Sequence, residues 1–164
     1  LDNLLRSELT RPVARDRVLL WELKRSCLMA ALGCLPIALR VAFVLSKMTD
    51  WTDEMVARSL GITDKALKLR HLRAEQYLDD YLAPRCSHLD KHNPCTCPGR
   101  LGIALDEKFV RRRTFLADIP DEPFTSDGHQ NIHRLYGRLP RVILSEKYVD
   151  ALIELAQERA PASE

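Results

Sequence analysis

The sequence of 164 residues lacks any apolar run of eighteen or more, which is about the length that a membrane-spanning helix needs. It also lacks a basic start followed by an apolar core, so we expect no signal peptide and a cytoplasmic location. No phosphate-binding glycine loop, nucleophile elbow or pair of catalytic carboxylates stands out. These absences argue against a membrane protein and against an enzyme.

The composition is that of an ordinary globular protein, with 46% hydrophobic and 29% charged residues. The net charge is only +2, which by itself does not indicate a nucleic-acid binder. The charges are unevenly spread, however. Residues 85–113 carry seven basic and three acidic side chains, whereas residues 114–164 carry five and nine. The acidic tail is therefore either a solvated surface or a segment that folds back over the basic one.

Apolar residues recur at steps of three and four, a period that predicts helices, and no alternating strand pattern or internal repeat appears. We expect an all-α fold with helices over residues 15–33, 37–48, 52–60, 63–82, 101–115 and 145–158, and a loop over 118–131. We divide the chain into a lead-in helix (1–29), a helical domain (30–84), a Cys-rich segment (85–117) and an acidic tail (118–164). Cys27 and Cys34 fall on apolar helical positions, which predicts small core residues.

Residues 52–82 have the pattern of a helix–turn–helix. Thr52 and Thr63 can cap the two helices, and Gly61 suits the left-handed position that closes the first. Met55, Val56 and Leu60 are predicted to face inward, with Ile62 following as a buried contact.

In the last helix the apolar side is expected to be formed by Val149, Leu152, Ile153 and Leu155.

The residues around this pattern are also distinctive: Leu35-Pro36, Arg40 to Leu45, Trp51 to Thr63, Ala66 to Arg70, and Arg73-Ala74. Together, residues 30–82 resemble region four of bacterial sigma factors of the extracytoplasmic-function group. The resemblance implies a domain that binds the minus-35 promoter element and docks on the flap of core RNA polymerase. It also implies that the chain is the C-terminal part of a sigma factor, without region two, and does not start transcription alone.

Carried over by position, the resemblance places the DNA-contacting face of the second helix on Lys65, Lys68, Leu69, Leu72 and Arg73. The three basic residues share one helical face, from which they can reach phosphates or guanine edges. Leu69 and Leu72 depart from the family pattern, because an outward pair of leucines invites protein contact. A second hypothesis is therefore a metal- or redox-sensing regulator whose helix–turn–helix binds a protein partner.

His71 and the later run Arg111-Arg112-Arg113 are not assigned DNA contacts. His71 stands where the family has a core aliphatic residue, and we assign it no function. Arg111-Arg112-Arg113 could add phosphate contacts, but three adjacent arginines on a helix point in three directions, which favours a solvated role.

The acidic tail is predicted to pack on the helix–turn–helix or on polymerase. The parts of the tail expected to make this contact are Tyr136, Leu139, Val142, Ile143 and the last helix.

The Cys-rich segment places Cys86, His88, Cys95 and Cys97 within twelve residues. Thiolates and imidazole are preferred ligands of tetrahedral zinc, so this set predicts a zinc site. We expect His88 to be the fourth ligand, and His92, His129 and His133 are the alternatives. Reduced thiols in a polar loop, or a disulfide, are the other interpretations.

The order Cys, Asn-Pro-Cys and Cys also resembles a short Cys-rich extension that follows region four in some sigma factors of this group. Some members with Cys-rich C-terminal domains respond directly to metal ions. The resemblance therefore allows two roles for zinc, a structural staple or a metal- or redox-sensitive gate.

Overall fold

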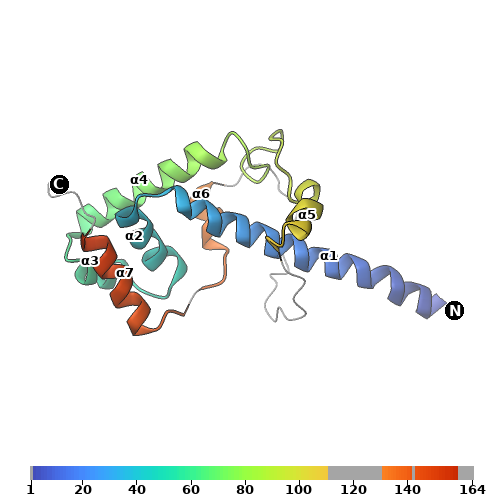
Figure 1. Cartoon of the computed structure of the whole chain (residues 1–164), viewed down its shortest axis with the longest axis horizontal. Coiled ribbons are helices and arrows are strands. Elements are labelled where there is room, and N and C mark those ends of the chain that lie inside the picture. Colours follow the sequence, from blue (N-terminus) through green and yellow to red (C-terminus); the bar gives the residue numbers. More distant parts are fainter. Residues whose placement is uncertain (1, 111–130, 142, 159–164) are drawn as a thin grey trace. The chain divides into compact units, whose positions relative to one another are not determined.

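The computed structural model describes residues 2–110, 131–141 and 143–158, with side chains from residue 17 onward. Over these ranges the chain is helical and contains no β-strand, which confirms the all-α prediction (Figure 1). The helices are α1 (Asp2–Ala31), α2 (Ile37–Met48), α3 (Asp53–Leu60), α4 (Asp64–Leu82), α5 (Cys97–Asp106), α6 (Ile132–Gly137) and α7 (Glu146–Glu158), with a 3-10 turn, η1, at Leu32–Cys34. None of these helices combines the length and apolar character that a membrane crossing requires.

The chain forms two compact units. The first unit contains residues up to Ala30 together with the segment that begins at Arg85, and so includes α5. The second unit contains Ala31–Pro84 together with the C-terminal segment that carries α6 and α7.

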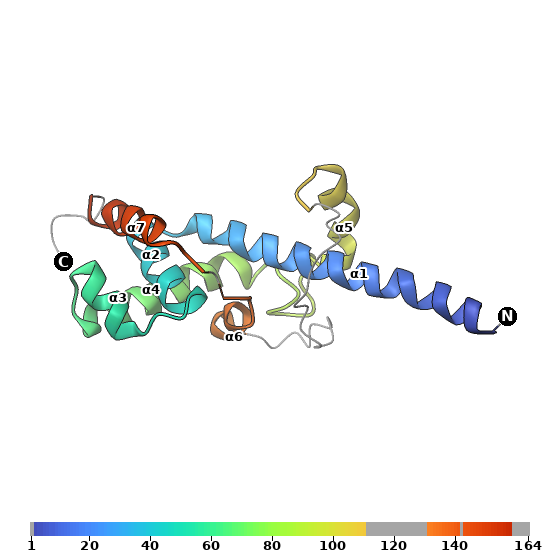
Figure 2. The same ribbon diagram turned by 90° about the horizontal axis from the view of Figure 1, so that it is seen from below.

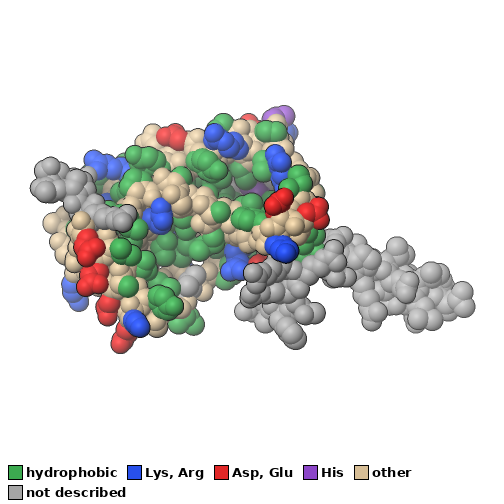
Figure 3. Space-filling model, in the orientation of Figure 1, with side chains coloured by type: hydrophobic (Ala, Val, Ile, Leu, Met, Phe, Trp, Pro, Cys, Tyr) green, Lys and Arg blue, Asp and Glu red, His purple; other side chains and the backbone are tan. Residues whose placement is uncertain are grey.

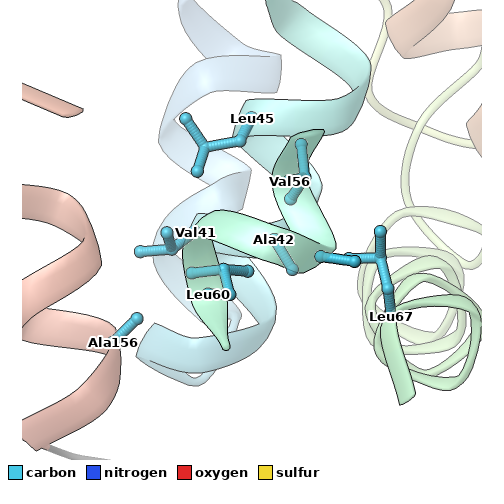
Figure 4. Close-up of a cluster of buried hydrophobic side chains, with 8 residues drawn as sticks. Val41, Ala42, Leu45, Val56, Leu60, Leu67 and Ala156 are labelled. Atoms are coloured by element: carbon cyan, nitrogen blue, oxygen red, sulfur yellow. The ribbon is translucent and has the colours of Figure 1, made fainter. Parts of the chain in front are cut away.

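The core of the second unit lies where α2, α3, α4 and α7 meet. Figure 4 shows buried side chains from these helices converging on one another. The cluster consists of Val41, Ala42 and Leu45 from α2, Val56, Ala57 and Leu60 from α3, Leu67 from α4, and Ala156 from α7. The C-terminal helix α7 is therefore part of the same hydrophobic core as α3 and α4.

The helix α6 packs against α2 and α4 (Figure 2). Its Tyr136 is almost fully buried and meets Phe43 of α2 edge to face, with ring centroids 5.2 Å apart and planes at 89°. Edge-to-face contacts of this kind are favoured because the positive edge of one ring meets the negative face of the other. This short helix was not predicted, because its apolar pattern is too brief to give a periodic signal.

The helix α7 has an apolar side toward the core and an acidic side toward solvent. Glu146, Asp150, Glu154 and Glu158 recur every four residues and are exposed, and acidic side chains line this helix in Figure 3. Val149 and Ala156 are buried, whereas Leu155 is 40% exposed and was wrongly predicted to face the core.

The turn between α3 and α4 follows the predicted capping pattern. The Thr52 hydroxyl accepts a hydrogen bond from the Met55 N–H, and the Thr63 hydroxyl accepts one from the Ala66 N–H. Gly61 adopts φ 66°, and backbone N–H groups of Gly61 and Ile62 donate to the last turn of α3, which closes the helix. Met55 is 45% exposed, which corrects the prediction that it faces inward.

In the first unit, α5 packs against the C-terminal half of α1. Leu19 and Leu23 of α1 form a buried cluster with Ala104 and Val110. The helix α5 begins at Cys97 and ends at Asp106, earlier than the predicted range of 101–115, because Thr96 caps it and Pro98 stands in its first turn. Residues 111–115 of the predicted helix and 118–130 of the predicted loop lie outside the described residues.

Candidate nucleic-acid interface and metal site

The helix α4 presents one side to the core and another to solvent. Its buried residues recur at steps of three and four, as helix packing requires: Leu67, His71, Ala74, Leu78 and Leu82. The residues predicted to contact DNA occupy the exposed side: Lys65, Lys68, Leu69, Leu72 and Arg73. The structure therefore brings all five to the solvent-exposed side of one helix.

The exposed face of α4 is basic and apolar near its start and acidic toward its end. Lys65 and Lys68 lie in the first turns, and Arg73 follows near the middle of the helix. Leu69 is 43% and Leu72 is 62% exposed, so the two leucines form an apolar strip among these cations. Farther along, the carboxylates of Glu75, Asp79 and Asp80 reduce the positive charge. Only the first half of α4 is thus suited to contact phosphates.

His71 lies behind this face, inside the second unit. It is 7% exposed, and its Nε2 atom has no hydrogen-bond partner among the described residues. Burial lowers the pKa of His71, and the Lys47 ammonium lowers it further; Asp53, Glu75 and a hydrogen bond with the Ala42 backbone act in the opposite direction. This imidazole is therefore a core residue, as expected, but an incompletely hydrogen-bonded one.

The predicted metal ligands lie in residues 86–97 of the first unit, called the Cys loop below, which ends at Cys97, the first residue of α5. A β-bridge pairs Cys86 with Cys95, held by hydrogen bonds from Ser87 N to Cys95 O and from Cys95 N to Arg85 O, each 3.1 Å long. The Asn93 side chain donates to the Cys86 carbonyl at 3.0 Å, which closes the intervening turn. These contacts hold the two Cys segments, nine positions apart in sequence, side by side.

Cys97, at the start of α5, also meets His88 of the loop. The Cys97 sulfur lies 3.5 Å from Nε2 of His88, which is close to the separation of about 3.5 Å expected for a sulfur and a nitrogen bound to one tetrahedral zinc. His88 itself is only 4% exposed. Burial raises the pKa of the Cys86 thiol, and hydrogen bonding from the backbone N–H groups of His88 and Leu89 offsets part of this rise. Donors of this kind orient and stabilise thiolate ligands.

The electrostatics of the loop favour protonated thiols when no metal is bound. Burial raises the pKa of Cys97 to about 12, and the thiols of Cys86, Cys27 and Cys95 contribute to this rise. Burial likewise raises the pKa of Cys86, while the Lys24 ammonium lowers the pKa of both thiols. A metal ion binding here must therefore displace protons, as it does at thiolate sites in general.

The chemistry of the donor set fits zinc, but the side chains are not arranged as a finished site. Within the described residues, no three Cys, His, Asp or Glu side chains are arranged so as to hold a metal ion. All five cysteines are described, and each is a free thiol. Metal binding therefore requires the side chains to reorient on the loop that the bridge holds together.

The alternative fourth ligands are placed differently. His92 is exposed, and its Nδ1 lies 2.9 Å from an Asp90 carboxylate oxygen. His133 belongs to α6 in the second unit, with its Nδ1 3.8 Å from Glu75. His129 and Arg111, Arg112 and Arg113 lie outside the described residues. Among the histidines that the structure describes, His88 is the one beside a Cys-loop sulfur.

The remaining cysteines correct the sequence-based interpretation. Cys27 and Cys34 are both exposed and are not core residues. Cys27 stands on α1, and partial burial of its thiol raises its pKa, with a further rise from the thiols of Cys95 and Cys86.

Comparison with protein-family models, with curated proteins and with solved structures finds no match to this chain.

Proposed function

We propose that this chain is the promoter-binding part of an RNA polymerase sigma factor of the extracytoplasmic-function group. In this proposal α3 and α4 form a helix–turn–helix, and α4 enters the major groove of the minus-35 element. The same unit docks on the flap of core RNA polymerase. The resemblance of residues 30–82 to region four supports the proposal.

The observation that carries the proposal is the exposed basic side of α4 behind a Gly-closed turn. Lys65, Lys68 and Arg73 lie on the side opposite the buried residues Leu67 and His71. A helix in the major groove needs cations on its outward side, since phosphate contacts supply much of the affinity. Leu69 and Leu72 on the same side can contact thymine methyl groups.

The second part of the proposal is a zinc ion held by the Cys loop. Cys86, Cys95 and Cys97 supply thiolates, and His88 is the nearby imidazole. Bound zinc would cross-link the loop, and backbone N–H groups would support the Cys86 thiolate. With four protein ligands the site would have no open position for a substrate, which favours a structural or regulatory role.

The alternative function is a metal- or redox-sensing regulator whose α3–α4 unit binds a protein. The exposure of Leu72, at 62%, is the observation that favours it. Apolar side chains in the middle of a polar face are typical of protein-binding surfaces. Lys68 and Arg73 are required by the DNA-binding function but not by the protein-binding alternative.

The experiment that separates them measures DNA binding by fluorescence anisotropy, using duplexes selected by the full chain from a randomised pool. Lys68→Ala and Arg73→Ala should each weaken binding about 5-fold or more, and each should reduce the salt dependence by about one phosphate contact. Lys147→Ala, which removes an exposed lysine of α7, is the matched control and should leave binding unchanged.

The same variants are then assayed for binding to purified core RNA polymerase. Retention of polymerase binding by Lys68→Ala and Arg73→Ala, with loss of DNA binding, supports the sigma-factor function. Unchanged DNA binding in both variants refutes the proposed interface. Loss of polymerase binding in Leu72→Ala alone would instead assign this face to a protein.

A further inference from the structure

Leu69 and Leu72 lie near the centre of the outward side of α4, away from the helical positions that are buried. Leu72 is 62% and Leu69 is 43% exposed, whereas Leu67 and His71 are 1% and 7% exposed. Because each residue of an α-helix turns the chain by about 100°, Leu69 and Leu72 are separated by about 60° around the helix axis. The two leucines therefore form one narrow apolar strip on the outward side.

A cation stands on each flank of this strip. Lys68 lies about 40° around the helix from Leu72, on the side away from Leu69. Arg73 lies about 40° from Leu69, on the side away from Leu72. Both basic side chains are exposed. The first half of α4 therefore presents an apolar centre between two positively charged edges.

This arrangement of charge matches the major groove of DNA. The groove is about 12 Å wide, close to the diameter of about 10–12 Å of a helix with its side chains. A helix lying in the groove turns the centre of its outward side to the base edges and its flanks to the phosphates of the two strands. Lys68 and Arg73 are placed for the phosphates, which leaves the two leucines facing the bases.

Leucine discriminates among base pairs because it neither donates nor accepts a hydrogen bond. A G·C pair presents polar groups and no methyl group in the major groove, and covering these polar groups with leucine would leave them without partners. An A·T pair presents the C5 methyl group of thymine. Residues three apart on a helix have Cβ atoms about 5–6 Å apart, and successive bases are stacked about 3.4 Å apart. Leu69 and Leu72 can therefore reach methyl groups on neighbouring base pairs.

We propose that Leu69 and Leu72 determine the sequence specificity of this chain by reading thymine methyl groups on two neighbouring A·T pairs. Lys68 and Arg73 position the helix in the groove and carry little of this specificity, because phosphates are the same at every base pair. The inference rests on the proposed DNA binding and names the base step that α4 recognises.

Deoxyuridine, which is thymidine without the C5 methyl group, tests this assignment. Duplexes selected by the full chain from a randomised pool should share two neighbouring A·T pairs. In fluorescence anisotropy, replacing either of their thymines with deoxyuridine should weaken binding about 4-fold, and replacing both about 15-fold, as expected for the loss of one or two buried methyl groups. Replacing thymines elsewhere in the duplex is the control and should leave the affinity unchanged.

Two variants assign each methyl group to its leucine in double-mutant cycles. Leu72→Ala should make the affinity insensitive to deoxyuridine at one of the two positions, and Leu69→Ala should do so at the other. Leu155→Ala is the matched control, because it truncates a leucine of α7 that is 40% exposed. This variant should keep the full dependence on both methyl groups.

The possible failures of the inference and of the proposed function can be told apart. Equal affinity of wild type for the thymine and deoxyuridine duplexes would overturn the inference and leave the DNA-binding function intact. Full methyl dependence in both Leu69→Ala and Leu72→Ala would also overturn it, because other residues would then read the methyl groups. Failure of wild type to bind any duplex would overturn both the inference and the proposed DNA-binding function.

Discussion

Arg141 and Thr49, which are 92 positions apart, are joined by a hydrogen bond of 2.8 Å from Nη1 of Arg141 to the Thr49 carbonyl oxygen. The same nitrogen donates to the Lys47 carbonyl at 2.9 Å. Both carbonyls lie at the end of α2, where backbone oxygens have no helical partner. The guanidinium thus caps α2 from the segment that leads to α7.

Arg141→Ala should lower the free energy of unfolding of the second unit by about 1 kcal/mol. A buried hydrogen bond from a charged donor contributes more than about 1 kcal/mol to stability. The Arg141 side chain is half exposed, which reduces its contribution. Urea unfolding followed by Trp51 fluorescence, in a Trp21→Phe background, reports on this unit. Arg134→Ala removes another exposed arginine of the same segment and should change stability by less than about 0.5 kcal/mol. Equal effects of the two variants would contradict the capping role.

Gly61→Ala should destabilise the second unit by about 1 kcal/mol through backbone strain alone. A Cβ at this position would meet no atom within 4 Å, so no steric clash contributes. The cost arises because φ is +66°, a conformation that L side chains rarely adopt. Gly137→Ala is the control, since it also has open space but no positive φ, and it should be neutral or stabilising by about 0.5 kcal/mol. The same urea assay compares the two, and a stabilising Gly61→Ala would refute the argument.

Local signals explain which parts of the fold were predictable from the sequence. Thr52, Gly61 and Thr63 act on backbone atoms within a few residues, so the bounds of α3 and α4 follow from short-range chemistry. The long amphipathic pattern of α7 likewise predicts its range. The exposed side of α4 could also be predicted, because helical periodicity assigns each residue to a side.

The remaining features depend on contacts between distant residues. Tyr136 holds the helix α6 against Phe43 of α2. No sequence pattern predicts this contact, because the two residues are far apart in the chain. Cys27 shows the same limit in the first unit: it fits an apolar helical pattern, yet its side chain is exposed. Spacing within a segment identifies Cys86, Cys95 and Cys97 but carries no information on what folds against them.

Tyr136→Ala should destabilise the second unit by about 3–5 kcal/mol, because it removes a fully buried ring and leaves a cavity beside Phe43. Tyr136→Phe keeps the ring and should cost about 1 kcal/mol. Tyr148→Ala is the control, since Tyr148 is 69% exposed on α7. The urea assay measures all three, and a small effect of Tyr136→Ala would show that α6 does not contribute to the core.

His71 should make the second unit less stable as the solution is acidified. Burial lowers its pKa in the folded state below the ordinary value of 6.5, so the unfolded chain binds a proton more readily. The contribution of the neutral imidazole is therefore complete above pH 6.5 and is lost as the pH falls from 6.5 toward the lower folded value. Urea unfolding at intervals from pH 7.5 to 5 measures this loss.

His71→Leu should flatten this pH dependence, because leucine is apolar and has no proton to gain. Wild type and His71→Leu should therefore diverge below pH 6.5, with the variant retaining more of its stability. Parallel profiles for wild type and His71→Leu would show that protonation of His71 does not oppose folding, and that its burial in α4 is electrostatically neutral.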